Sequence, residues 1–246
     1  MTDLLLFQLR RVGRNRQYLF FTVVLPALFT VFFTKIIGGQ VAAGEYQDVA
    51  RATMISMMAY GAIGAALGAT IRIAFDRSSG WLRQLRVLPV PPAATLAVDV
   101  VVGTLLALPG LVVVALVGRF VNDVQLGLGT WLTLVGALWA GSVVFVGLGM
   151  AIGLALDEQA AGAAIGILGT VLAALGGLWF PVEVFPDGMV GLARAMPSYW
   201  YAELGRDVAA GTPSGTPVVL LAGYAVAFAA VALAVARRRP LHAVAG

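Results

Sequence analysis

Side chains able to do covalent or metal chemistry are scarce in this chain of 246 residues. It has no cysteine, and its single histidine, His242, lies near the C-terminal end, so the sequence offers no multi-histidine or thiolate metal site. No G-x-x-x-x-G-K-[ST] occurs, because the one lysine, Lys35, follows a threonine. G-x-S-x-G and H-E-x-x-H are missing as well. The sequence therefore predicts a protein that is not an enzyme and that binds no metal or nucleotide itself.

Two ionisable residues, Arg72 and Asp99, lie inside long apolar stretches. Charged groups are costly there, so each is a functional candidate. Both fall near the same end of their stretch, and we expect them to form a structural ion pair. This position is too shallow for the mid-membrane titratable group that ion-coupled carriers use.

The composition excludes an ordinary soluble protein. Hydrophobic residues make up 60% of the chain, charged residues 11%, and the mean hydropathy is +0.93. Soluble domains are about 25% charged. The same numbers argue against a disordered binder. The net charge of +4 is better explained by membrane topology than by nucleic-acid binding.

Six apolar stretches, each near the ~20 residues that a membrane-spanning helix needs, predict an all-α polytopic membrane protein. Lipid cannot satisfy exposed backbone groups, and the stretches are continuous rather than alternating, so helices are expected and a β-barrel is not. We treat the chain as one transmembrane domain over residues 1–246. The predicted spans are 18–38, 52–75, 95–118, 131–156, 160–180 and 217–236.

The arginines predict the orientation. With six spans both termini lie on one side, and that side holds eleven basic residues against five on the other. The eleven are Arg10, Arg11, Arg14, Arg16, Arg72, Arg77, Arg83, Arg86, Arg237, Arg238 and Arg239. The five are Lys35, Arg51, Arg119, Arg194 and Arg206. The positive-inside bias therefore places both termini in the cytoplasm.

The segments outside the spans carry further predictions. The sequence of residues 1–17 predicts an amphipathic helix at the membrane interface. Residues 181–216 form the longest outer segment and are too apolar for a free loop, so we expect re-entrant helices, including one from about Asp187 to Ala195.

The segment between the second and third predicted spans indicates a docking helix. Trp81–Leu88 can form two helical turns with Leu82, Leu85 and Leu88 on one face, and Pro89 ends them. A short helix with an apolar ridge fits a groove in a partner.

This segment resembles a motif of the transmembrane subunits of ABC transporters of the type-2 exporter class. That motif reads acidic-Arg-x-x-Gly-x-Leu-x-x-Leu-x-x-x-Pro-Val, and the matching residues are Asp76, Arg77, Gly80, Leu82, Leu85, Pro89 and Val90. The family usually has Glu where this chain has Asp76. Further matches are Asp157-Glu158-Gln159-Ala160 and the run from Gly176 to Glu183.

The resemblance implies a permease subunit of an exporter in a bacterial plasma membrane, working as a dimer with a second permease copy. Two copies of a separate cytoplasmic ATPase would bind ATP and Mg²⁺. The resemblance also implies that these subunits couple to the permease through residues 76–90, which include Arg83, and through Asp157 and Glu158. The first, second and fifth spans would line the path. Candidate path or gate residues are Phe29, Phe32, Phe33, Met57, Met58, Leu175 and Trp179.

Aromatic and methionine side chains in the predicted path favour an amphipathic or hydrophobic cargo, such as a drug, lipid or peptide. A homodimer and a heterodimer with a related permease both remain open. The alternatives are an ion-coupled secondary carrier and a membrane scaffold or immunity-type protein without transport.

Overall fold

The structure is a computed structural model that describes residues 15–42, 44–78 and 92–238. These residues form helices and turns without any strand, which confirms the predicted all-α class. Within them, six segments are long and apolar enough to cross a membrane, as predicted. They are Arg16–Gly38, Tyr46–Phe75, Ala97–Phe120, Leu128–Ala155, Glu158–Leu175 and Gly215–Arg237.

Three of the six spans are interrupted, and the other three are single helices. The first consists of α2 (Arg16–Leu19), a π-helical turn η1 (Phe20–Val24) and α3 (Leu25–Gly38). The third consists of α6 (Pro92–Leu105) and α7 (Leu108–Phe120), and the fourth of α8 (Leu128–Gly141) and α9 (Val143–Ala155). The uninterrupted helices are α4 (Tyr46–Ser78), α10 (Glu158–Leu175) and α13 (Gly215–Arg238).

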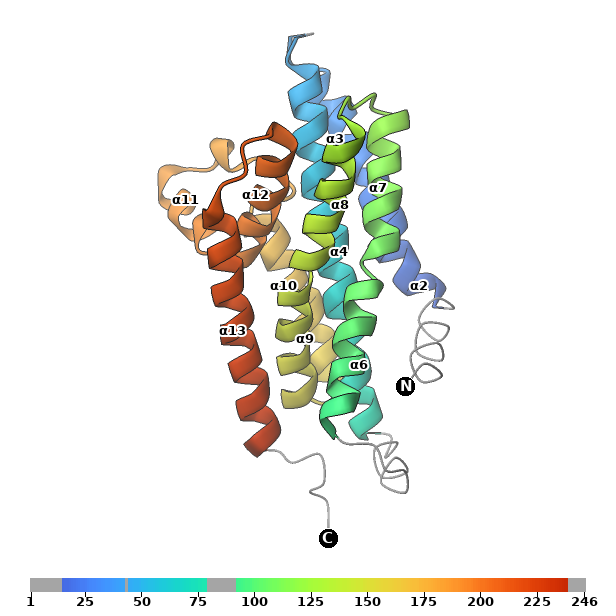
Figure 1. Cartoon of the computed structure of the whole chain (residues 1–246), viewed down its shortest axis with the longest axis vertical. Coiled ribbons are helices and arrows are strands. Elements are labelled where there is room, and N and C mark those ends of the chain that lie inside the picture. The colour runs from blue at the N-terminus through green and yellow to red at the C-terminus, as the bar shows by residue number, and fades with distance from the viewer. Residues whose placement is uncertain (1–14, 43, 79–91, 239–246) are drawn as a thin grey trace.

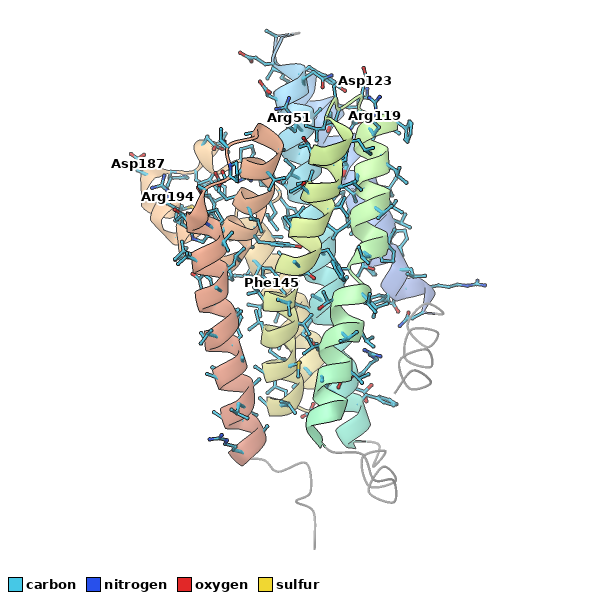
Figure 2. All side chains as sticks on the ribbon, in the orientation of Figure 1. Arg51, Arg119, Asp123, Phe145, Asp187 and Arg194 are labelled. Carbon is cyan, nitrogen blue, oxygen red and sulfur yellow. The ribbon has the colours of Figure 1, made fainter. Side chains whose placement is uncertain are left out.

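The helices run up and down between two ends of an elongated bundle (Figure 1). The C-terminal ends of α4 and α13 and the turn between α9 and α10 lie at one end. The α7–α8 connection lies at the other end, toward which α11 (Asp187–Arg194) and α12 (Pro197–Ala210) are also placed. Figure 2 shows Arg51, Arg119 and Asp123 grouped at this second end.

The second span, α4, is the centre of the bundle. It packs against the first, third, fourth and fifth spans and against α12. In its apolar window 78% of the residues are buried, against 11% in the sixth span. Met54, Leu67 and their neighbours on α4 are fully buried in the main core cluster. The helix therefore crosses the membrane inside protein rather than inside lipid.

Two stacked glycines let α9 lie close to α4. A Cβ at Gly149 would come within 2.2 Å of the Thr70 hydroxyl oxygen, and one at Gly153 within 2.9 Å of the Thr70 carbonyl oxygen. Thr70 itself is 1% exposed and donates its hydroxyl to the Leu67 carbonyl. This is the close backbone approach that small-xxx-small spacing provides between membrane helices.

The fifth span ends earlier than predicted. The predicted end is residue 180, but α10 ends at Leu175. Gly176 caps the helix, and Gly177 adopts a left-handed φ of 73° that the helix cannot continue through. The Leu178 N–H then donates to the Ala173 carbonyl in a helix-ending pattern. Trp179 and Phe180 therefore lie beyond the helix.

The outer segment contains the predicted short helix and one that was not predicted. α11 begins at Asp187 and ends at Arg194, close to the expected bounds, and Figure 2 places both residues at the edge of the molecule. α12 follows, with Pro197 in its first turn and Gly211, at φ 72°, just after its end. These are ordinary start and stop signals of a helix.

α12 is bound to three spans by side-chain hydrogen bonds. Ser198 donates to the Leu172 carbonyl of α10 at 2.7 Å, and the Tyr201 hydroxyl donates to the Leu138 carbonyl of α8. Arg206 donates to the Ser56 hydroxyl of α4 at 3.3 Å. Complete burial raises the pKa of Tyr201, so this hydroxyl remains a donor at physiological pH.

Candidate translocation cleft

A cleft of about 680 Å³ opens between the first and fifth spans, with α4 as its floor. Clefts of this volume accommodate small-molecule ligands. The first span contributes Asn15, Gln17, Tyr18, Phe21 and Thr22. The floor contributes Tyr60, Ile63, Gly64, Gly68, Ile71, Arg72 and Phe75. The α10 wall contributes Glu158, Gly162, Ile165, Gly166, Gly169 and Thr170.

The α10 wall is shaped by three glycines that the described part of the chain leaves uncovered. A Cβ at Gly162, Gly166 or Gly169 would meet no described atom within 4 Å outside its own helix. Their spacing resembles that of Gly149 and Gly153, but here no helix of the described residues fills the space. The α10 wall is therefore open to whatever lies beside it.

The cleft is polar at one end and apolar along its length. Arg72 and Glu158 belong to the end where α4 stops and α10 starts. The Arg72 Nε donates to the Ala69 carbonyl at 2.8 Å. Phe21, Ile63 and Ile165 line the apolar part. This arrangement can accommodate an amphiphile with its polar end near Arg72. The pairing of Arg72 with Asp99 stays a prediction.

An aromatic cluster closes the other end of the cleft. The Tyr60 ring lines the cleft, stacks on Phe29 with centroids 6.5 Å apart, and meets Trp179 edge-on at 5.8 Å. Phe33 connects Phe29, at 5.4 Å, to Phe180, at 6.3 Å. The ring contacts connect the first span, the floor and the chain that follows α10 at the Tyr60 end of the cleft. The Trp179 Nε1 is buried and has no acceptor in the described part of the protein.

The predicted path residues divide into three groups. Phe29, Phe33 and Trp179 belong to the aromatic cluster. Phe32, 56% exposed, and the half-buried Leu175 lie at the surface of the chain.

Met57 and Met58 occupy a different place: they are 1% and 0% exposed in the core around α4. Met57 shares the helix face of Tyr60 and Gly64 but lies one turn beyond Tyr60, whereas Met58 faces another side of α4, so neither residue lines the cleft.

The predicted coupling residues are only partly described. Asp76 and Arg77 belong to the last turn of α4, whereas Gly80, Leu82, Arg83, Leu85 and Pro89 lie outside the described residues, as do residues 1–14 of the predicted interface helix. Asp157 caps α10, its carboxylate accepting from the Ala160 N–H at 2.9 Å. Glu158 follows in the first turn, where its charge suits the helix dipole.

Sequence patterns missed Tyr18 and Tyr60 as cleft residues. Each sits in an apolar run, where an aromatic side chain is normally interpreted as core or interface. A helical projection would have aligned Tyr60, Gly64, Gly68 and Arg72 on one face of α4, which is the signal that was available.

Six apolar spans, five of them around the buried central helix α4, with a cleft between the first and fifth, define a multi-pass membrane protein. The model of the ABC-2 type transporter family matches residues 4–209, and the chain belongs to that family. It is 29% identical over 227 residues to "Putative transport permease YvfS" of Bacillus subtilis (strain 168), with 90% of each chain covered. These matches confirm the resemblance to type-2 ABC permeases. The family implies a partner ATPase subunit.

Proposed function

We propose that this permease exports an amphipathic or hydrophobic compound through the cleft formed by its first, second and fifth spans. The observation that carries the proposal is the cleft itself, which is polar at the Arg72 end and closed by aromatic rings at the other. An amphiphile fits such a gradient, because its polar part stays near Arg72 and Glu158 while its apolar part contacts Phe21 and Ile63.

A second permease copy would cover the cleft and complete the path. The wall at Gly162 and Gly166 is open, and only 22% of the apolar window of α10 is buried. The first span is equally uncovered. A homodimer and a heterodimer both satisfy this need, and membrane lipid would contact the remaining spans.

The proposed orientation places both termini in the cytoplasm of a bacterium. The eleven-to-five distribution of basic residues supports it. Arg51, Arg119 and Arg194 belong to the minority side, and Figure 2 shows all three toward one end of the bundle. In this orientation α11 and α12 lie outside and residues 76–90 lie inside, where two copies of a cytoplasmic ATPase would bind them.

The partner would bind ATP and Mg²⁺ and hydrolyse ATP, and the permease would hold neither. A secondary carrier is the less favoured alternative, because the charged residues of the cleft lining, Arg72 and Glu158, share one end of it. A scaffold or immunity-type protein would have no use for a cleft that crosses much of the bundle.

Coupling is tested by placing a charge on the predicted docking ridge. We expect Leu85→Asp to weaken binding of the co-expressed ATPase subunit at least about tenfold, because a carboxylate replaces a central apolar contact. The measurements are co-purification of the two subunits and ATP-dependent transport of an amphipathic dye in proteoliposomes. Gln84→Asp adds the same charge beside the ridge of Leu82, Leu85 and Leu88 rather than on it, and is the matched control. Full assembly and transport with Leu85→Asp would refute the proposed coupling.

The proposed re-entrant character of the outer segment has its own test. Val184 and Leu192 are 69% and 45% exposed in the chain, whereas Ala193 is buried. If the segment dips into the membrane, cysteines at Val184 and Leu192 will resist a membrane-impermeant maleimide although protein does not cover them. A cysteine at the exposed Asp187 should react at least about tenfold faster, because ionised thiolates form poorly in an apolar medium. Equal, rapid labelling at all three exposed positions would show an aqueous loop instead.

A further inference from the structure

The first span has an internal break. In η1 the Leu25 N–H donates to the Phe20 carbonyl five residues earlier, instead of four. Pro26 follows directly and has no N–H, so the Thr22 carbonyl has no α-helical donor. π-turns and prolines are the usual causes of bends in helices.

The break is held by close packing rather than by strong hydrogen bonds. The Thr22 carbonyl oxygen lies where a Cβ on Gly61 of α4 would come within 3.0 Å and one on Gly110 of α7 within 2.7 Å. Two glycine backbones from different spans therefore enclose it. This carbonyl already lacks a helical donor, so the helix can change direction there without breaking an α-helical hydrogen bond to it.

Beyond the break, the outer half of the span is fixed to the third span. Asn122, which is 1% exposed at the end of α7, donates to the Thr30 carbonyl at 3.1 Å and to the Thr34 hydroxyl at 3.0 Å. Both acceptors are buried. Buried hydrogen bonds of this kind are costly to break, so α3 and α7 are joined firmly.

Before the break, one side-chain hydrogen bond within the described residues ties the inner half to α4. The Tyr18 hydroxyl donates to the Ala65 carbonyl of α4 at 2.9 Å, and the Tyr18 ring lies over Gly68, where a Cβ would come within 2.9 Å. Among described residues, this is the single side-chain hydrogen bond that joins residues 15–24 to another span. Tyr18 also lines the cleft.

The opposite wall leaves the inner half room to move. α10 packs mainly against α4 and α9, while η1 packs against α4 and α7. The two walls of the cleft thus both pack against α4, and neither packs mainly against the other. Any outward swing of residues 15–19 widens the cleft without first separating them from α10.

We propose that Tyr18 is a latch that holds the inner segment Arg16–Leu19 against α4, and that this segment swings about Phe20–Val24 to widen the cleft. Releasing the Tyr18–Ala65 bond is the step that opens it. Its use in admitting cargo rests on the proposed function, whereas the swing itself is a property of this chain that can be measured alone.

The test measures the distance between the two walls. The chain has no cysteine, so spin labels can be placed at Gln17 and Ala163, both exposed, without background. The labelled permease, in nanodiscs, is diluted with unlabelled chain so that distances within one subunit dominate. We expect Tyr18→Phe to raise the population of the longer distance at least about threefold. Tyr224→Phe, which removes a matched hydroxyl-to-carbonyl bond to Ala195, should leave the distribution unchanged.

A second label pair locates the pivot. Labels at the exposed Ile36 and Leu132 report on the outer half of the span, and their distance should not change with Tyr18→Phe. Superimposable Gln17–Ala163 distributions in Tyr18→Phe and the natural chain would overturn the latch. Lengthening of both pairs would overturn the pivot at η1. If the distances change as expected but the natural chain does not transport the amphipathic dye, the result would contradict the proposed function and leave the latch intact.

Discussion

Replacing Gly149 with alanine is expected to destabilise the permease by about 1–3 kcal/mol, the usual cost of an added methyl group in a filled core. The new Cβ would lie 2.2 Å from the Thr70 hydroxyl oxygen and 3.1 Å from its Cβ. Thr70 is β-branched and buried, so it cannot move aside without losing its hydrogen bond to Leu67. The effect is measured as a lower thermal midpoint in detergent.

The control for this substitution is Gly136→Ala, because a Cβ at Gly136 meets no atom within 4 Å. That change should be neutral or should stabilise the helix by about 0.5–1 kcal/mol, since alanine favours helix more than glycine does. Adding Thr70→Ala to Gly149→Ala should restore part of the loss. An unchanged midpoint for Gly149→Ala would mean that α4 and α9 do not pack as described.

Filling the cleft is expected to stop transport without unfolding the protein. Gly166→Leu places a branched side chain into the open space along α10. Because the position has no neighbours within 4 Å, the thermal midpoint should hold. Cargo that must share this volume loses contact worth about 1.4 kcal/mol or more, which corresponds to about a tenfold lower transport rate of an amphipathic dye.

Gly136→Leu is the matched change on another uncrowded helix face, outside the cleft lining. Transport by this variant should equal that of the natural chain. The oligomeric state of each variant, measured by light scattering, separates a filled path from a lost subunit contact. Unimpaired transport by Gly166→Leu would remove α10 from the path.

The spans were predictable because lipid imposes a simple rule: a crossing helix must be apolar along a length fixed by the bilayer. The rule identified six spans but not their interruptions. η1 precedes Pro26, a signal that a count of apolar residues ignores, and the break between α8 and α9 follows Gly141, which lies against Tyr201. Gly177 ends α10 through a left-handed backbone, although the apolar sequence continues to Phe180.

Helices that do not cross the membrane were harder to predict, because no requirement for a long apolar stretch applies to them. α12 mixes aromatic, charged and small residues, and its Glu203 and Arg206 form an ion pair at 2.9 Å on a partly covered face. No single period dominates such a helix. Pro197 and Gly211 were the usable signals, and they mark its bounds correctly.

Predicting the cleft required information that residue spacing alone does not contain. Gly149–Gly153 and Gly162–Gly166 have the same spacing, yet the first pair is packed against Thr70 and the second is open. Which pair is covered follows from the rotation of α9 and α10 about their axes. Likewise, Met57 and Tyr60 are neighbours on α4, but one is buried in the core and the other faces the cleft.

The attachment of α12 has a mechanical consequence. Ser198, Tyr201 and Arg206 join the outer parts of three crossing helices, and close contacts at Gly141 and Gly176 reinforce two of these joints. Because α12 joins these ends, they move together. A displacement of the opposite end of α4 would therefore tilt α4, α8, α10 and α12 as one group. In the proposed transport cycle such a group would move as a unit, and the displacement that releases cargo would occur along its borders with the first span, with lipid or with another chain.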